Sequence, residues 1–209
     1  MTLHGYFRST ASWRVRIALG LKGLKAEQVF HHLRRGEQRA PDYLALNPQG
    51  LLPAFVTDDG EVLTQSLAII EYLDEVAPSP ALLPADPVLK AKVRAVAQVV
   101  ACDIHPVQNL KVLARLRALG LSEDQVQAWA ATTIEEGLDA IDQLLAHQPG
   151  PFAFGPEVTL ADLFIVPQLG NARRFGVELR WPRLIALETA CLELPAFADA
   201  APGRQADAE

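Results

Sequence analysis

A proline-rich segment separates two stretches of the chain that have different hydrophobic patterns. Pro78-Ser79-Pro80 and Pro84-Ala85-Asp86-Pro87 interrupt regular structure, because proline fixes φ and lacks the backbone N–H that helices and central strands need. Before this segment, strand-like and helix-like runs alternate; after it, Ala, Leu and Val recur at helical spacing. We therefore expect an α/β domain over residues 1–80, a linker over 81–87 and an all-helical domain over 88–209.

The elements expected in the first domain describe a mixed sheet with helices. The sequence predicts strands at 2–7, 27–33, 53–57 and 61–64, and helices at 12–23, 40–46 and 66–76. Asp58-Asp59-Gly60 predicts a hairpin turn between the last two strands. This order of elements is typical of a layered α/β fold.

The second domain is expected to contain helices only. The sequence predicts helices at 88–118 and 122–147, a capping box at Thr159 and Asp162 that begins a further helix, and a frayed tail at 201–209. Pro106 lies inside the first of these helices, so we expect a kink just after His105. Asp162 is interpreted as a structural residue because the capping box explains it.

Composition argues against several classes of protein. The 209 residues are 50% hydrophobic and carry a net charge of −6 with Lys and Arg spread along the chain, so no nucleic-acid partner is expected. Apolar stretches fall short of the roughly 20 residues that span a bilayer, and no secretory signal is recognisable. Cys102 and Cys191 form neither a C-x-x-C motif nor a metal-ligand spacing, so we expect reduced thiols, no metal site and a cytoplasmic location.

Residues 8–19 (RSTASWRVRIAL) place hydroxyl side chains where the first strand gives way to a helix. Ser9, Thr10 or Ser12 could cap that helix, whose start presents free N–H groups and the positive end of the dipole. An anion fits there, and a thiolate is one such anion, since its pKa falls near a helix N-terminus. The alternative is that these hydroxyls only cap the helix. Arg14 and Arg16 are interpreted as structural because the helix directs them away from its own start.

Two further features lie in the same domain. A cis bond between Leu52 and Pro53 would turn the backbone of Leu52 outward, where an extended peptide could pair with it; an ordinary trans proline is the alternative. Ser66, after Gln65, is predicted to cap a helix whose start could hold a carboxylate. A thiolate site, an edge for a peptide and a carboxylate site together indicate a short peptide thiol such as glutathione.

From about Thr2 to Asp207 the chain resembles the zeta-class glutathione transferases. Residues 8–19 are similar to the family signature Ser-Ser-Cys-x-Trp-Arg-Val-Arg-Ile-Ala-Leu, with Thr10 in place of the second Ser and Ala11 in place of the Cys. Further matches lie at 45–48 (ALNP), 65–73 (QSLAIIEYL), 106–110 (PVQNL) and 171–175 (NARRF). The resemblance implies the glutathione transferase fold, a thioredoxin-like domain followed by an all-α domain, in a homodimer with glutathione as cofactor.

The resemblance also implies roles for individual residues. Ser9 would stabilise the glutathione thiolate, supported by the helix start with Thr10 and Ala11. The remaining glutathione contacts would come from Gln38, Leu52, Pro53, Gln65 and Ser66, and from the second domain through His105, Asn109 and Lys111. Family members commonly carry Gln and Ser at the positions of His105 and Lys111. Arg8 and Arg174 would meet the carboxylates of a small dicarboxylate substrate. Because Ala11 replaces the signature Cys, that thiol has no obligatory role in this chain.

By the same resemblance the activity is a glutathione-dependent cis–trans isomerisation of maleylacetoacetate to fumarylacetoacetate in tyrosine and phenylalanine breakdown. Two alternatives use the same thiolate: isomerisation of maleylpyruvate in gentisate degradation, and a transferase or dehalogenase acting on small α-halo acids. A non-catalytic binding protein would not need Ser9, Gln65, Ser66 and Asn109 together. A disulfide oxidoreductase would need a cysteine near Ser9, and the nearest in sequence is Cys102.

Overall fold

The protein is described by a computed structural model that covers residues 1–209. Its contacts form two compact units, one of residues 1–81 with 192–209 and one of residues 82–191. The expected linker at 81–87 therefore lies at a boundary between units. The last residues, which the sequence analysis grouped with the second domain, make their contacts within the first unit.

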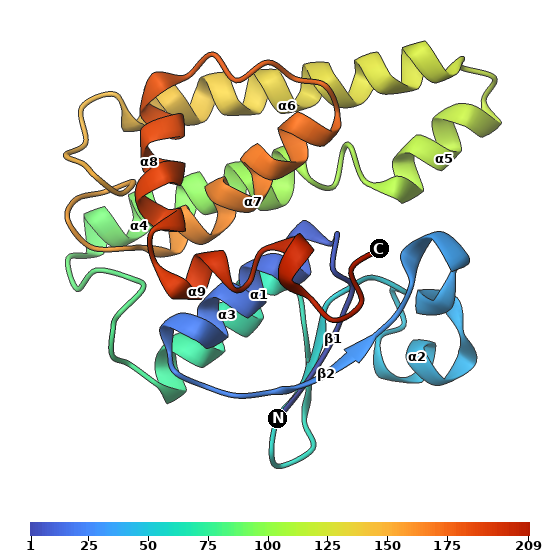
Figure 1. Ribbon diagram of the computed structural model, residues 1–209, viewed down its shortest axis with the longest axis horizontal. Helices are drawn as coiled ribbons and strands as arrows, with labels where there is room; N and C mark the ends of the chain where they lie inside the picture. The colour runs from blue at the N-terminus through green and yellow to red at the C-terminus, as the bar shows by residue number, and fades with distance from the viewer. The chain divides into compact units, whose positions relative to one another are not determined.

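The first unit is built on a four-stranded mixed sheet with the strand order β2-β1-β3-β4. Figure 1 labels two of these strands, β1 and β2, together with the helices of this unit. Strand β1 pairs in parallel with β2 and antiparallel with β3, and β3 pairs antiparallel with β4. The strands are β1 (Thr2–Gly5), β2 (Glu27–Phe30), β3 (Ala54–Val56) and β4 (Val62–Thr64). The helices are α1 (Thr10–Leu21), α2 (Pro41–Leu46), α3 (Ser66–Val76) and α9 (Pro195–Ala198), with short 3₁₀ turns η1 (Leu33–Arg35), η2 (Glu37–Arg39) and η4 (Pro202–Arg204).

The mixed α/β arrangement expected from the sequence is confirmed, with shorter strands. The expected helices at 40–46 and 66–76 correspond to α2 and α3, and Gly60, with φ 85°, closes the expected hairpin turn between β3 and β4. Helix α1 begins at Thr10, two residues before the expected start at 12, because Ser9 supplies its N-cap.

The tail expected to fray at 201–209 is instead folded against the first unit. Gly20 of α1 lets α9 approach closely: a Cβ at Gly20 would lie 3.1 Å from Cα and Cβ of Ala196. Beyond α9, the backbone N–H of Phe7 donates to Oδ2 of Asp207 at 2.9 Å. The composition of the tail gave no sign of these contacts, because their partners lie at the other end of the chain.

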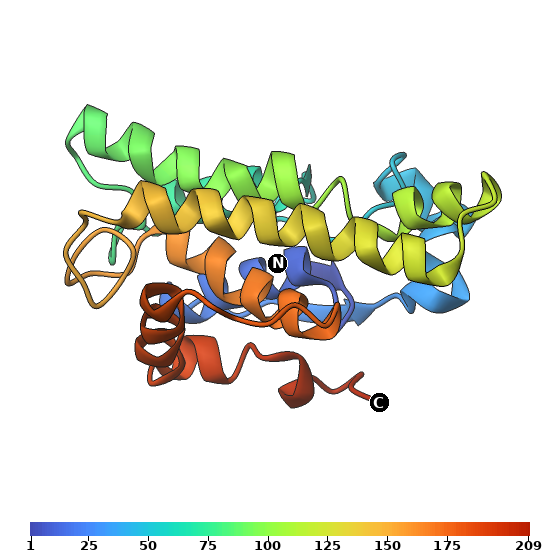
Figure 2. The same ribbon diagram turned by 90° about the horizontal axis from the view of Figure 1, so that it is seen from above.

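The second unit is helical, as expected (Figure 2). Its elements are α4 (Pro87–Gln98), η3 (Val99–Ile104), α5 (Leu110–Ala118), α6 (Glu123–Leu145), α7 (Leu160–Arg174) and α8 (Pro182–Leu192). Ser122 caps α6 in a capping box with Gln125, and the capping box of Thr159 and Asp162 at the start of α7 is confirmed. No helix has the length and apolar character needed to cross a membrane.

The single long helix expected at 88–118 is wrong, because three elements occupy this stretch. Helix α4 continues into η3, a π-helix whose last hydrogen bond runs from the N–H of His105 to the carbonyl of Val100 at 2.9 Å. Pro106 follows and has no N–H to continue the ladder. Asn109 then caps the separate helix α5 by accepting the N–H of Lys111 at 3.0 Å.

A glycine of α6 makes room for the π-helix. A Cβ added to Gly137 would overlap Cγ1 and Cδ1 of Ile104, which is fully buried. The side chain of Ile104 thus occupies the space beside Gly137, and this packing favours the π-helical register that ends at His105.

We expect Gly137→Ala to destabilise the protein by about 1–3 kcal/mol, because the added methyl collides with the buried side chain of Ile104 and forces it to move. The double variant with Ile104→Ala should lose less stability than the sum of the two single variants, since the colliding atoms are then absent. Urea unfolding of the four proteins measures this coupling. Additive losses would mean that the two residues do not constrain one another.

Candidate functional site

The start of α1 is held by Ser9. Its Oγ accepts the backbone N–H of Ser12 at 3.2 Å, and its own N–H donates to the carbonyl of Tyr6 at 3.0 Å. Of the three candidate caps, Ser9, Thr10 and Ser12, the structure therefore assigns this role to Ser9. Ser9 is 9% exposed, whereas Ser12 is fully buried. Because a hydroxyl that accepts one bond still has its proton, the O–H of Ser9 can donate to an anion.

The residues on either side of Ser9 complete this helix start. Thr10 is the first helical residue and is buried, and Ala11 follows in the first turn with a partly exposed surface. The first N–H groups of a helix have no partner within the helix, so they add to the positive end of the dipole. Arg8 is partly exposed and its guanidinium lies over the ring of Phe7, 5.1 Å from the centroid.

A second helix start in the same unit belongs to α3. The expectation that Ser66 caps this helix is wrong by one residue: Gln65 is the cap residue and Ser66 is the first helical residue. Gln65 adopts φ 68°, a left-handed conformation that costs a non-glycine residue energy and is often found at functional sites. The Oγ of Ser66 accepts a hydrogen bond from Arg14 at 3.3 Å.

Arg14 adds a buried positive charge near the start of α3. Arg14 is 2% exposed, and burial lowers its pKa to about 9. Arg14 was interpreted as structural from the sequence. The structure shows that Arg14 reaches the start of α3. The expectation that α1 directs both arginines away from its own start is wrong for Arg16, whose guanidinium donates to the carbonyls of Tyr6 and Phe7 just before α1, because helical side chains lean toward the N-terminus of their helix.

The loop before β3 is fixed by hydrogen bonds to its backbone. The Leu52–Pro53 bond is cis, as the sequence analysis considered. The carbonyl of Leu51 accepts the hydroxyl of Tyr43 at 2.6 Å and the side-chain amide of Asn47 at 2.7 Å. Leu52 itself is partly exposed.

Side-chain contacts bring the other candidates of the first unit together. The amide of Gln65 donates to Oε1 of Gln49 at 2.9 Å, which links the start of α3 to the loop before β3. A Cβ at Gly50 in that loop would lie 3.3 Å from the carbonyl oxygen of Gln38. The Oε1 atom of Gln38 is buried and has no hydrogen-bond partner within the chain. Gln38, Gln65 and Ser66 therefore lie in one region, in which an acceptor is free.

The candidates of the second unit lie at the ends of its helices. His105 ends the π-helix, and Asn109 and Lys111 lie at the start of α5. Arg174 is exposed at the end of α7, where it donates to Asn171 and lies over the ring of Phe175.

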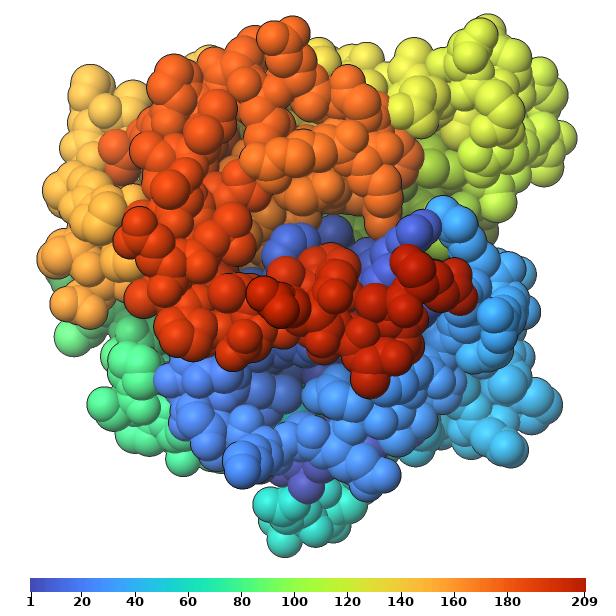
Figure 3. All heavy atoms as spheres, viewed as in Figure 1, coloured from blue at the N-terminus to red at the C-terminus, as the bar shows by residue number.

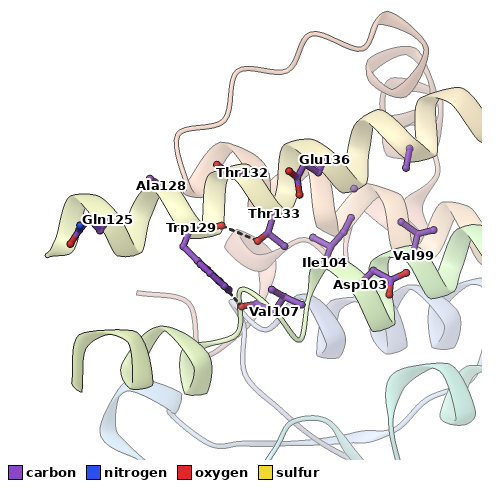
Figure 4. Close-up of a pocket in the computed structure, with 12 residues that line it drawn as sticks. Val99, Asp103, Ile104, Val107, Gln125, Ala128, Trp129, Thr132, Thr133 and Glu136 are labelled. Atoms are coloured by element: carbon purple, nitrogen blue, oxygen red, sulfur yellow. Dashed lines mark hydrogen bonds between the residues drawn. The ribbon is translucent and has the colours of Figure 1, made fainter. Parts of the chain in front are cut away.

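A cavity in the second unit contains none of the predicted site residues. It has a volume of about 710 Å³ and lies open between η3 and α6 (Figure 4). Trp129 crosses it and donates its indole N–H to the carbonyl of Val107 at 3.1 Å. Its lining is mostly apolar, with Asp103 and Glu136 as the charged members, and it offers no basic side chain to an anionic ligand.

A cluster of two histidines and a tyrosine supports the sheet beside the loop before β3. Nδ1 of His4 and Nε2 of His31 are 2.9 Å apart, and the ring of Tyr43 lies 4.5 Å from that of His31. Burial lowers the pKa of both histidines, and His31 lowers that of His4 further. Burial also raises the pKa of Tyr43 to about 12, so its hydroxyl stays protonated and can donate to Leu51.

Two family models match the chain. "Glutathione S-transferase, N-terminal domain" matches residues 8–76, and "Glutathione S-transferase, C-terminal domain" matches residues 111–189. Together they span more than half of the sequence. The first match begins at residue 8, where the signature used for the resemblance also begins, and the two matches confirm the expected order of domains.

Individual relatives agree with these matches. A maleylacetoacetate isomerase from Pseudomonas aeruginosa is 50% identical over 99% of this chain and 98% of its own length. The holo structure of a maleylpyruvate isomerase, described as a bacterial zeta-class glutathione S-transferase, has a TM-score of 0.97 at 46% identity, with 100% of both chains covered. A maleylacetoacetate isomerase from Methylobacterium extorquens, solved with malonate and glutathione bound, has a TM-score of 0.96 at 38% identity over 100% of both chains.

We expect the histidine pair to make stability depend on pH. Because the folded pKa values lie below the ordinary value of 6.5, the unfolded state binds more protons, and the free energy of unfolding falls as the pH drops below about 6.5. Replacing both residues, His4→Gln with His31→Gln, should flatten this decline between pH 7 and 5 in urea unfolding.

Asp162 acts in the opposite direction in part of this range. Burial raises its pKa from 3.8 to about 6, so its contribution to stability is lost as the pH rises through that interval. Because Asp162 is present in both proteins, its contribution cancels when the free energies of unfolding of the double variant and the original protein are subtracted. An unchanged slope in the double variant would contradict the role assigned to the histidines.

Proposed function

Because the chain belongs to the glutathione transferase family, in its zeta class, we propose that it is a glutathione-dependent cis–trans isomerase of a small unsaturated diketo acid. The observation that carries this proposal is the start of α1, where Ser9 caps the helix and keeps a hydroxyl proton to donate. The preferred substrate is maleylacetoacetate, which would be converted to fumarylacetoacetate in tyrosine and phenylalanine breakdown.

The residues of the first unit suit glutathione. Ser9 would donate to the sulfur, and the helix start at Thr10 and Ala11 would lower the pKa of the thiol. The start of α3 at Gln65 and Ser66, with Arg14 hydrogen-bonded to Ser66, offers a positive environment to the γ-glutamyl carboxylate. Glutathione bound in the Methylobacterium extorquens relative supports this assignment.

Two more features of the first unit suit the peptide part of this ligand. Leu52 is partly exposed after a loop that Tyr43 and Asn47 hold in place, so its backbone can pair with an extended peptide. Gln38 has a buried acceptor that lacks a partner within the chain and suits an N–H donor of the ligand. Contacts from Pro53, His105, Asn109 and Lys111 stay predictions drawn from the resemblance.

The nucleophile in this proposal is not a residue of the protein. Ala11 carries no thiol, Cys102 lies on the π-helix of the second unit, and Cys191 is buried, which raises the pKa of its thiol. When bound, glutathione supplies the sulfur that adds to the cis double bond and leaves again after rotation about the resulting single bond, so that it is not consumed. Ser9 would hold the sulfur ionised at the beginning and end of each turnover.

The substrate carboxylates need positive charge. Arg8 lies directly before Ser9 and is partly exposed, so it is placed to meet a carboxylate or the negative charge that develops beside the double bond. Arg174 is the second candidate and is exposed at the end of α7. The malonate bound in the Methylobacterium extorquens relative shows that a related protein accepts a small dicarboxylate.

Maleylpyruvate is the alternative substrate, because one of the most similar structures is a maleylpyruvate isomerase. The two substrates differ by one methylene between the last keto group and its carboxylate, so the difference is one of length, and His105 and Lys111 are the residues to vary first. A transferase or dehalogenase acting on small α-halo acids would consume glutathione, whereas an isomerase leaves its total unchanged. The homodimer and the cytoplasmic location stay predictions.

The test is a glutathione-dependent isomerisation assay that compares maleylacetoacetate with maleylpyruvate. We expect turnover of maleylacetoacetate with unchanged total glutathione, and a fall of about 10²–10³-fold in kcat for Ser9→Ala, the range found when a single donor to a developing anion is removed. Ser9→Thr is the matched control, because it keeps the hydroxyl and should retain more activity than Ser9→Ala.

Circular dichroism would show whether each variant keeps its fold. Full activity in folded Ser9→Ala would contradict the role of Ser9 and direct attention to Thr10. Turnover of maleylpyruvate faster than that of maleylacetoacetate would make maleylpyruvate the preferred substrate. Consumption of glutathione would show that the protein is a transferase or dehalogenase and not an isomerase.

A further inference from the structure

The last residues of the chain contact the loop that precedes α1. We name residues 199–209 the C-terminal tail and residues 6–9 the Ser9 loop. Both belong to the first unit, and Figure 3 shows the end of the chain, in red, lying over N-terminal segments, in blue. We propose that the C-terminal tail positions the Ser9 loop, with Asp207 as the positioning residue. This proposal deepens the proposed function, since it rests on Ser9 as the partner of the thiolate.

The first contact is made by Asp207. Its Oδ2 accepts the backbone N–H of Phe7 at 2.9 Å, across 200 positions of the sequence. Phe7 is 4% exposed, so its N–H has little access to water and needs an acceptor from the protein. Hydrogen bonds from a backbone N–H to a carboxylate are stronger than those between neutral groups.

The second contact is made through Arg16 of α1. Its guanidinium donates to the carbonyls of Phe7 at 3.1 Å and Tyr6 at 3.5 Å, and to the carbonyl of Ala200 in the tail at 3.1 Å. Arg16 is 8% exposed and burial lowers its pKa to about 10, while the charge of Asp207 acts in the opposite direction. One buried cation thus joins the tail to the loop, with a tail carboxylate favouring its charged form.

The third contact of the C-terminal tail is made by Glu209, its last residue. Oε1 of Glu209 lies 2.9 Å from Nε2 of His32 and 3.7 Å from the guanidinium of Arg35. The ring of His32 in turn meets the ring of Tyr6 edge-on, with 5.0 Å between centroids. The residues on both sides of Asp207 are therefore anchored, and this limits how far its carboxylate can move.

The carbonyl oxygen of Tyr6 connects these contacts to Ser9. The carbonyl of Tyr6, which Arg16 holds, also accepts the N–H of Ser9. A shift of the loop would move Ser9 relative to the helix start that it caps. Misplacement of a reacting group by about 1 Å can cost a factor of about 10² in rate, so an anchor that never touches the ligand still affects turnover.

The test compares Asp207→Ala with Asp207→Asn. The alanine variant removes the acceptor, whereas the side-chain oxygen of asparagine can still accept the N–H of Phe7. Asp199→Ala is the matched control, because Asp199 is an exposed carboxylate of the same tail whose side chain makes no contact with the loop. Two quantities are measured: amide hydrogen exchange of residues 6–9 in the protein without glutathione, and kcat and KM for the isomerisation.

We expect Asp207→Ala to speed exchange of the Phe7 amide by at least about tenfold and to lower kcat by about tenfold or more, with a smaller change in KM for glutathione. Asp207→Asn should recover most of both losses, and Asp199→Ala should change neither. This split and the rescue by asparagine distinguish positioning from a general loss of stability.

Unchanged exchange and kcat in folded Asp207→Ala would overturn the proposal, as would a loss in Asp199→Ala of the same size. If Asp207→Ala does not fold, the proposal is tested with Asp207→Asn and the original protein. A Phe7 amide that exchanges in the original protein as fast as in a free peptide would contradict the proposal. If the original protein does not isomerise the substrate but the exchange results are as expected, the proposed function is wrong and the positioning of the Ser9 loop by Asp207 still holds.

Discussion

The capping of α1 by Ser9 is the interaction on which the site depends. One hydroxyl accepts the N–H of Ser12 and so begins the helix two residues earlier than the sequence pattern indicated. The same hydroxyl keeps its proton, and it lies at the start of α1, where the positive end of the helix dipole favours an anion. Ser9 would therefore have two roles at once: its oxygen caps α1, and its proton would be donated to a thiolate at the same helix start.

Helix α1 then connects the parts of the first unit through three buried cations. Arg14 reaches Ser66 at the start of α3, and Arg16 reaches the backbone of the Ser9 loop and of the C-terminal tail. Lys22, near the end of α1, forms an ion pair with Asp74 of α3 at 2.6 Å. Buried charges are costly unless they are satisfied, so each of these contacts fixes one neighbour of α1 in a defined position.

Local signals in the sequence were enough for most of the fold and for the helix start that Ser9 caps. Hydrophobic periodicity, the hairpin turn and the capping residues depend on near neighbours, and they gave the mixed sheet and the capping box of Thr159 and Asp162. Long-range contacts were not accessible. The π-helix requires Gly137 beside Ile104, and the folded tail requires Asp207 beside Phe7, and neither pairing leaves a periodic pattern in the sequence.

The central claim is that the protein binds glutathione with its thiol ionised beside Ser9. The most direct measurement is a pH titration of the ultraviolet absorbance of the thiolate, with glutathione bound to the original protein and to Ser9→Ala. We expect the thiol pKa in the original protein to lie clearly below the ordinary value of about 8.5, and to return toward it in Ser9→Ala. A bound thiol that titrates as it does in free solution, or a lowered pKa that persists in Ser9→Ala, would contradict the account.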